Sequence, residues 1–231
     1  MVGDPRWIRS DSCTVHSHFG EHVGKERNMG IAVLVLGQSG TGKSASLRNF
    51  KEGEIGIFNV ASKPLPFRGN LKTVNGPNYD LIMKKLEENT LKTYAIDDSQ
   101  YLMVFEEFAK VKVAGYGKFS EMALNFYNLV QCAIMRTSPD TIVYFLHHTE
   151  RDDEGHIKAK TVGKMIDSKL TLEGLFSVVL LTGTDGNEYW FETQSDGMTT
   201  AKSPIGLFED KRIPNDLKYV DTQIREYWGL K

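Results

Sequence analysis

The sequence predicts an α/β fold: a mostly parallel central sheet flanked by helices, with a C-terminal β-hairpin and helix. Three observations support this. Short, continuous apolar runs alternate with segments whose apolar residues recur every three or four positions. The runs resemble strands that are buried on both faces. Polar or glycine-rich residues follow several runs directly, at the sheet edge where such folds bind ligands.

Composition limits the possible classes of protein. The chain has 231 residues, 40% hydrophobic and 25% charged, which suits one globular domain. The formal net charge of −2 means that nucleic-acid binding would need a local basic patch. Two cysteines in different contexts, Cys13 and Cys132, favour a reducing compartment, so we expect the cytoplasm. We expect no signal peptide and no membrane partner, because the apolar runs are too short to cross a bilayer.

Residues 1–28 differ from the rest of the chain in composition. They lack apolar periodicity, and the composition changes abruptly just before the first apolar run. They contain three of the six histidines: His16, His18 and His22. We therefore expect a flexible leader over 1–28 and one domain over 29–231. The alternative is that Met29 lies close to the natural start. The His-x-His spacing could bind a metal, but a disordered arm makes that the less favoured interpretation.

The expected strands come from apolar runs that end at glycine, acidic or histidine residues. They cover residues 31–36, 55–60, 93–96, 141–146 and 176–181. Residues 188–192 are expected to pair, across the turn at 183–186, with the strand over 176–181 or with a neighbouring strand, and so to form the hairpin.

The expected helices come from apolar spacing and capping residues. They cover residues 43–50, 79–86, 119–133 and 217–227. Asn78 is expected to cap the second helix, in which Tyr79, Ile82 and Leu86 share a face. The apolar face of the last helix is expected to carry Leu217, Val220, Ile224 and Tyr227.

A glycine-rich loop follows the first strand. It reads Gly-x-x-x-x-Gly-Lys-Ser, the complete Walker A pattern, and lies between a strand and an expected helix. Its glycines would let backbone N–H groups surround phosphates, Lys43 would face the β- and γ-phosphates, and Ser44 would ligate magnesium. The following helix would add its positive end. We expect ATP and Mg²⁺ as cofactors, bound by Gly37, Gln38, Ser39, Gly40, Thr41, Gly42, Lys43, Ser44 and Ala45.

Acidic residues follow the third strand. Asp97 is the expected second metal-binding residue, the Walker B role, because magnesium needs a carboxylate at a neighbouring strand end. Asp98 either orients the attacking water or caps the turn. Glu106 and Glu107 are further candidates for the general base, with a solvated helix face as the alternative, especially for Glu107.

Two histidines follow the fourth strand. His148, ahead of His147, is the candidate for sensing the γ-phosphate by hydrogen bonding. The alternative is a pair of structural histidines near the sheet edge.

Two basic, glycine-containing stretches at 110–118 and 150–164 are candidate sites for single-stranded DNA. Lysines can follow a phosphate backbone, and a tyrosine can stack on a base. The candidate residues are Lys112, Tyr116, Lys118, Lys158, Lys160 and Lys164. The alternative is a pair of ordinary surface loops.

The order of these parts resembles the RecA-like core of P-loop recombinases. Four segments are more narrowly similar to bacteriophage ATP-binding proteins of the AAA-domain type: Ile96–Leu102, His147–Glu150, Lys160–Lys164 and Ile213–Leu217. That group includes small ATPases implicated in phage single-strand annealing and recombination. The resemblance spans roughly residues 30 to 228.

The resemblance implies that loops 110–118 and 150–164 correspond to the two DNA-binding loops of the recombinase core. It implies that His148 stands where recombinases have a nucleotide-sensing glutamine. It also implies a ring or filament of identical subunits, in the host cytoplasm if the protein is phage-encoded, with a single-strand-binding protein as a further candidate partner. Recombinases carry a catalytic glutamate after the second strand, whereas residues 59–64 offer none. Hydrolysis would then be slow, or would use Asp98 or Glu106.

Three other functions are alternatives to a DNA-binding ATPase. A small-molecule kinase would need lid arginines, and the segment 150–164 has Arg151 alone. A regulatory GTPase would need an Asn-Lys-x-Asp motif, which the sequence lacks. A nucleotide-gated scaffold with little turnover is favoured by the missing glutamate. A neighbouring subunit could complete the site with Lys164, Lys202 or Arg212.

Overall fold

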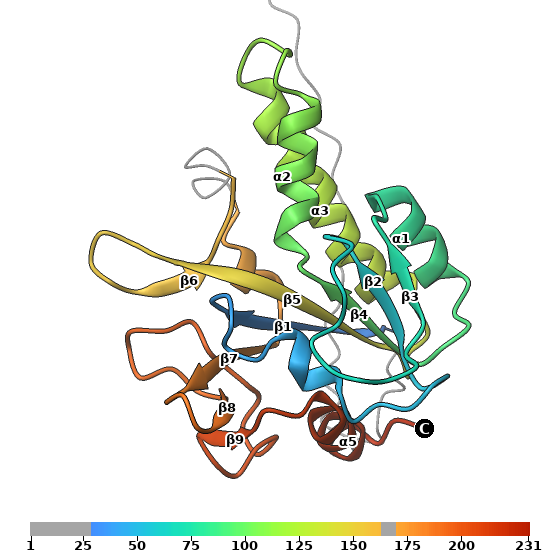
Figure 1. The fold of residues 1–231 in the computed structure, drawn as a ribbon, viewed down its shortest axis with the longest axis vertical. Helices are drawn as coiled ribbons and strands as arrows, with labels where there is room; N and C mark the ends of the chain where they lie inside the picture. The colour runs from blue at the N-terminus through green and yellow to red at the C-terminus, as the bar shows by residue number, and fades with distance from the viewer. Residues whose placement is uncertain (1–28, 163–169) are drawn as a thin grey trace, which may run out of the picture.

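The computed structural model describes residues 29–162 and 170–231 (Figure 1). The expected leader over 1–28 lies outside the described residues, so it stays a prediction. Lys164, a candidate DNA-binding residue, also lies outside them.

The described chain forms one nine-stranded sheet in the order β3-β2-β4-β5-β1-β7-β8-β9, with β6 paired to β5. The strands from β3 to β7 along this order run parallel, and β6, β8 and β9 pair antiparallel. Their bounds are β1 Ile31–Gly37, β2 Gly56–Asn59, β3 Thr73–Asn75, β4 Thr93–Asp97, β5 Ile142–Arg151, β6 Ile157–Ala159, β7 Val178–Thr184, β8 Tyr189–Glu192 and β9 Arg212–Pro214. The predicted α/β fold with a mostly parallel sheet is therefore confirmed, as is the β7–β8 hairpin.

Helices cover both faces of the sheet (Figure 1). The α-helices are α1 Tyr79–Glu87, α2 Gln100–Ala109, α3 Gly117–Met135 and α5 Leu217–Trp228, and the 3₁₀ turns are η1 Ser44–Leu47 and η2 Leu172–Leu175. Because side chains alternate along a strand, Leu34 and Leu36 pack with the α1–α3 side. Val33 and Val35 pack with η1 and α5. Both faces of β1 are therefore buried, which explains its uninterrupted apolar sequence.

Two of the expected helices are confirmed in detail. The Asn78 side chain accepts a hydrogen bond from the Leu81 N–H and so caps α1, with Ile82 and Leu86 fully buried. In α5, the expected residues are buried except Tyr227, which is 41% exposed. The Tyr227 ring lies edge-on to Trp228 and outside the core, so its assignment to the buried face was wrong.

The helix expected over 43–50 is replaced by the single 3₁₀ turn η1. Leu47 and Phe50 are both buried at a spacing of three, which matches the 3₁₀ repeat, and the Phe50 N–H bonds to the Leu47 carbonyl. Gly53, at φ +83°, then turns the chain toward β2. So short a turn has little macrodipole, and the helix-end contribution expected at the phosphates is wrong.

β5 continues to Arg151, so His147 and His148 lie within the strand and do not follow its end. The extension is stabilised by β6, which pairs antiparallel with Thr149 to Arg151. β3, β6 and β9 have three residues each, too few to show a periodic pattern in the sequence.

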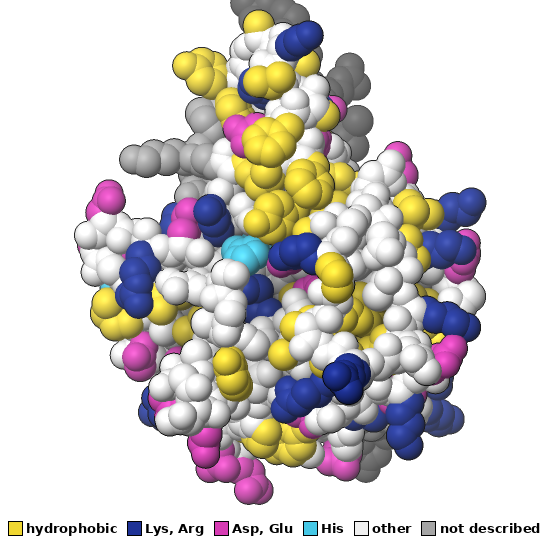
Figure 2. Space-filling view, viewed as in Figure 1, with side chains coloured by type: hydrophobic (Ala, Val, Ile, Leu, Met, Phe, Trp, Pro, Cys, Tyr) yellow, Lys and Arg dark blue, Asp and Glu magenta, His cyan; other side chains and the backbone are white. Residues whose placement is uncertain are grey.

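The α2–α3 pair rises from the sheet as a helical hairpin, with its connecting turn far from the strands (Figure 1). Apolar side chains gather along this projection on the face seen in Figure 2. Within the described ranges, no helix combines the length and apolar character that crossing a bilayer requires.

Candidate functional site

The loop after β1 lies beside the middle of β5 and near the carboxyl end of β4, because β4, β5 and β1 are consecutive parallel strands. The register places Gly37 opposite His148, and Leu36 opposite His147. A pocket of about 450 Å³ forms at this edge. Its lining includes the glycine-rich loop and the charged residues Lys43, Lys63, Asp97, Asp98 and His148.

The glycines of this loop are required by its backbone and its packing. Gly40 and Gly42 have φ values of +82° and +94°, where L-residues are strained. At Gly37, a Cβ atom would lie 1.8 Å from the Thr182 hydroxyl oxygen, so no larger residue fits. The loop therefore has the open, turned backbone that lets main-chain N–H groups face an anion.

Lys43 is 5% exposed, and its ammonium group donates to the carbonyl oxygens of Gly37 and Gln38 at 2.9 and 2.8 Å. Burial lowers the pKa of Lys43 to about 8, although Asp98 and Asp97 oppose the shift. An arriving anion would stabilise this buried cation more than neutral carbonyls do.

Ser44 and Asp97 meet across the pocket. The Ser44 hydroxyl donates to Asp97 Oδ1 over 2.8 Å. Burial raises the pKa of Asp97, and the neighbouring Asp98 adds to this, while the Ser44 hydrogen bond opposes it. Asp97 is thus a desolvated carboxylate that a cation would stabilise strongly.

Asp98 is held as a carboxylate by two partners. Lys63 Nζ lies 2.5 Å from one oxygen, and His148 Nε2 lies 3.1 Å from the other. Burial alone would raise the pKa of Asp98, but these hydrogen bonds outweigh it and hold the pKa at about 2. Ser62 and Asp98 both adopt left-handed backbone conformations, φ 55° and 59°. Such strain at a pocket is typical of functional sites.

His147 and His148 have different environments although they are adjacent. His147 is fully buried; its Nε2 donates to the Lys160 carbonyl, and its Nδ1 accepts from the Ser99 hydroxyl. Burial lowers the pKa of His147 to about 4, so it is a neutral structural residue. His148 alone faces the pocket, in agreement with its ranking as the better sensor candidate.

Lys63 was missed by sequence reasoning. It follows β2, the strand beside β4, and its ammonium group also lies 5.7 Å from the centre of the Tyr101 ring. The carboxyl ends of neighbouring parallel strands meet at one edge of the sheet. This relationship predicts Asp97 at the site, and it places Lys63 there as well. No sequence motif marks a lysine at this position, so Lys63 does not stand out from the residues around it.

Other expected site residues lie away from this pocket. Glu106 lines a separate pocket formed by residues of α1, α2 and α3, where its carboxylate accepts hydrogen bonds from Lys110 and Asn125. Glu107 lines neither this pocket nor the one beside the glycine-rich loop. Lys112 and Tyr116 lie in the exposed turn between α2 and α3, and Lys118 lies in the first turn of α3. On the β5–β6 hairpin, Lys158 Nζ lies 3.2 Å from Glu150, while Lys160 is exposed and its main chain bonds to His147 and His148.

The donor set fits the expected cofactors. A hydroxyl and a carboxylate within hydrogen-bonding distance suit magnesium, which keeps several waters and takes further oxygens from a substrate phosphate. Among the described residues, no group of three or more histidine, cysteine, aspartate or glutamate side chains is arranged so that it could hold a metal ion by itself. A two-residue protein contribution is the common pattern for magnesium bound together with a nucleotide.

No protein-family model matches the sequence, and no curated protein matches it either.

Proposed function

We propose that this chain is a RecA-like P-loop NTPase that binds ATP with Mg²⁺ and hydrolyses it. The observation that supports this most directly is the Ser44–Asp97 hydrogen bond at the base of a pocket walled by the glycine-rich loop. The buried Lys43 ammonium and the left-handed glycines suit a triphosphate. The six parallel strands and their order suit the RecA-like core.

The chain's own residues would bind and orient the nucleotide. Main-chain N–H groups of residues 37–45 would surround the phosphates, and Lys43 would exchange its carbonyl partners for phosphate oxygens. Ser44 and Asp97 would hold Mg²⁺. Magnesium, when bound with the nucleotide, neutralises charge on the β- and γ-phosphates.

Asp98 would position the attacking water and would not deprotonate it, because a carboxylate with a pKa of about 2 is a poor base. His148, which bonds to Asp98 Oδ1, would respond to the γ-phosphate. Turnover by this arrangement would be slow, which agrees with the missing glutamate after β2.

The test is ATP binding and turnover with and without Mg²⁺, for the wild type and Lys43→Ala. We expect Lys43→Ala to lower ATP affinity at least about tenfold and to abolish turnover. Lys72→Ala removes an exposed lysine outside the pocket and is the matched control. Tight Mg-ATP binding with no turnover in the wild type would favour the nucleotide-gated scaffold. Equal ATP affinity in both variants would overturn the proposal.

We propose further that the α2–α3 turn and the β5–β6 hairpin bind single-stranded DNA, in phage recombination, annealing, replication or repair. At the turn, Tyr116 is 73% exposed between Lys112 and Lys118, as a base-stacking residue flanked by phosphate-binding lysines would be. On the hairpin, Lys160 is exposed. As part of this proposal, the protein acts in the cytoplasm as a homo-oligomer, with a single-strand-binding protein as a partner.

The DNA proposal is tested by oligonucleotide binding with and without Mg-ATP. Tyr116→Ala is expected to weaken binding about tenfold. Leu124→Ala, an exposed apolar residue on α3, is the matched control. Mass measurement of the wild type would show a ring or filament. Unchanged DNA affinity in Tyr116→Ala would contradict the assignment of the α2–α3 turn.

A further inference from the structure

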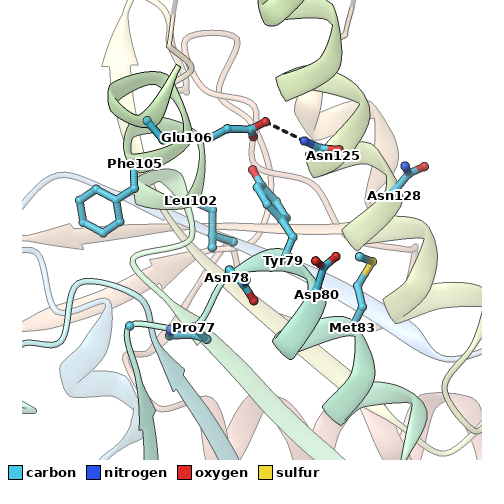
Figure 3. A pocket seen from close by; sticks show the side chains of 12 residues that line it. Pro77, Asn78, Tyr79, Asp80, Met83, Leu102, Phe105, Glu106, Asn125 and Asn128 are labelled. Atoms are coloured by element: carbon cyan, nitrogen blue, oxygen red, sulfur yellow. Dashed lines mark hydrogen bonds between the residues drawn. The ribbon is translucent and has the colours of Figure 1, made fainter. Parts of the chain in front are cut away.

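A second pocket, separate from the nucleotide pocket, is lined by residues of α1, α2 and α3 (Figure 3). Its volume is about 550 Å³, enough for a small organic group. Glu106 and Leu102 of α2, Tyr79 and Met83 of α1, and Asn125 of α3 all line it. None of these residues lines the nucleotide pocket.

Two buried polar atoms in this pocket have no hydrogen-bond partner among the described residues: the Tyr79 hydroxyl and Glu106 Oε2. Figure 3 shows the Tyr79 ring rising between α2 and α3 toward the Glu106 carboxylate. The other oxygen, Glu106 Oε1, already accepts from Lys110 and Asn125, each at 2.7 Å. The carboxylate is therefore fixed in position with one acceptor oxygen turned toward the Tyr79 hydroxyl and unused.

Leaving two buried polar atoms unpaired costs on the order of 1–3 kcal/mol each. Most buried polar side chains avoid this cost: Thr93, for example, is buried and bonded to Asp221 and Arg225. Outside this pocket, Thr199 and Asn215 also carry buried polar atoms without a partner among the described residues. Protein sites built to bind a polar group commonly carry this cost until the ligand arrives. Glu106 Oε2 can only accept, and the Tyr79 hydroxyl oxygen can accept as well as donate, so a ligand that donates hydrogen bonds would satisfy both atoms.

The charged and apolar side chains that line the pocket indicate which chemical class of ligand it would bind. Glu106 and Asp80 are both carboxylates in the pocket lining, and Lys110 is shared between Glu106 and Glu121. This surplus of negative charge would attract a cation and repel a phosphate. Leu102, Met83 and Phe105 supply apolar walls for an aliphatic stem, and the Phe105 ring can also contact a cation.

We propose that this pocket binds a guanidinium or alkylammonium group carried on an aliphatic stem. The cation donates to Glu106 Oε2 and the Tyr79 hydroxyl, and its stem packs against Leu102 and Met83. Two sources carry this chemistry: an arginine or lysine side chain of a protein segment, and a free small amine or guanidine. The site does not depend on nucleotide binding.

The experiment is a titration monitored by the Met83 methyl signal in NMR, with the wild-type protein at full length. The probes are capped arginine (N-acetyl-arginine methylamide), agmatine, and capped citrulline, which has the shape of arginine without its charge. We expect a guanidinium probe to bind at least about tenfold more tightly than citrulline. Binding of citrulline as tight as that of both guanidinium probes, or no shift with any of them, would overturn the proposal.

Two variants separate a binding role from a structural one. Glu106→Gln keeps the oxygen that accepts from Lys110 and Asn125 and replaces Oε2 with a donor, while Tyr79→Phe deletes the hydroxyl. Each is expected to weaken guanidinium binding about fivefold or more. Tyr79→Phe should also leave the melting temperature of the probe-free protein unchanged or raised, because its hydroxyl is unpaired. A lowered melting temperature with unchanged probe affinity would assign Tyr79 a structural role and contradict the proposal.

Glu107→Gln and Tyr127→Phe are the matched controls, since neither residue lines the pocket. They are expected to bind the probes as the wild type does. If Glu107→Gln and Glu106→Gln lost equal affinity for the guanidinium probes, the probes would be attracted non-specifically by negative charge, and the proposal would be wrong. Capped arginine carries backbone on its stem, so its binding would assign the pocket to a protein side chain. Binding of agmatine alone would assign it to a free small molecule.

Discussion

The Ser44 hydroxyl and the Asp97 carboxylate, 53 positions apart in sequence, are joined by a 2.8 Å hydrogen bond. Ser44 begins the 3₁₀ turn after the glycine-rich loop, and Asp97 is the last residue of β4. This contact brings together the hydroxyl and the carboxylate that we propose as magnesium ligands. Four predictions follow from this site and its surroundings.

Asp97→Asn should weaken the binding of Mg-ATP without lowering the stability of the fold. Burial and the adjacent Asp98 disfavour the charged form of Asp97, so the neutral isostere should keep or raise the melting temperature. Affinity for Mg-ATP should fall at least about tenfold, because a charged metal ligand is lost. Asp98→Asn is the contrasting control: it breaks the contacts with Lys63 and His148 and should lower the melting temperature. Equal melting shifts in both variants would contradict this account.

Lys63→Met should affect catalysis more than stability. The Lys63 side chain is 60% exposed, and Asp98, although buried, keeps its contact with His148, so loss of the Lys63 ion pair should cost on the order of 1 kcal/mol of unfolding free energy. Turnover should fall with little change in KM for ATP, since Lys63 fixes the carboxylate proposed to position water. Lys72→Met, whose lysine pairs with Glu52 at the surface, is the matched control. Wild-type kcat in Lys63→Met would exclude this positioning role.

The buried His147 should make the protein sensitive to mild acid. Its folded-state pKa of about 4 lies below the ordinary histidine value of 6.5, so its contribution to stability is complete above pH 6.5 and is lost as the pH falls to about 4. The loss should amount to about 3 kcal/mol of unfolding free energy. Chemical denaturation at several pH values would measure it.

His147→Asn should be less stable than the wild type at pH 7 but should show a flatter pH profile between 6.5 and 4. His156→Asn, which changes an exposed histidine on the β5–β6 turn, should keep the wild-type slope. A wild-type slope in His147→Asn would assign the acid sensitivity to other groups.

Gly37→Ala should destabilise the protein by about 2 kcal/mol, because the added methyl group would overlap the Thr182 hydroxyl at 1.8 Å. Replacing Thr182 with alanine in the same chain should recover part of this loss. Gly40→Ala is the comparison: a Cβ there meets nothing within 4 Å, so only the strain at φ +82° is felt, about 1 kcal/mol. Melting curves of the three variants would rank them, and equal losses at Gly37 and Gly40 would contradict the overlap.

Much of the fold could be predicted from local patterns. The buried strands β1, β4 and β7 are apolar runs, and α1 and α3 carry their apolar residues at helical spacing with a recognisable cap at Asn78. The short strands β3, β6 and β9 could not be predicted, since their three residues are ordered by pairing with a neighbour. The 3₁₀ turn after the phosphate loop also escaped prediction, because Leu47 and Phe50 fit either a helix or a tighter turn until the packing around them is known.

The sequence by itself determined the alternation of strands and helices, the glycine-rich loop and the residues at the strand ends, because each depends on residue types close together in the chain. Only the tertiary structure decided that Lys63 and His148 share Asp98, that His147 is buried, and that Glu106 lies in another pocket. Those facts depend on strand register and on which face of α2 meets its neighbours. Both are set by contacts between segments far apart in the sequence.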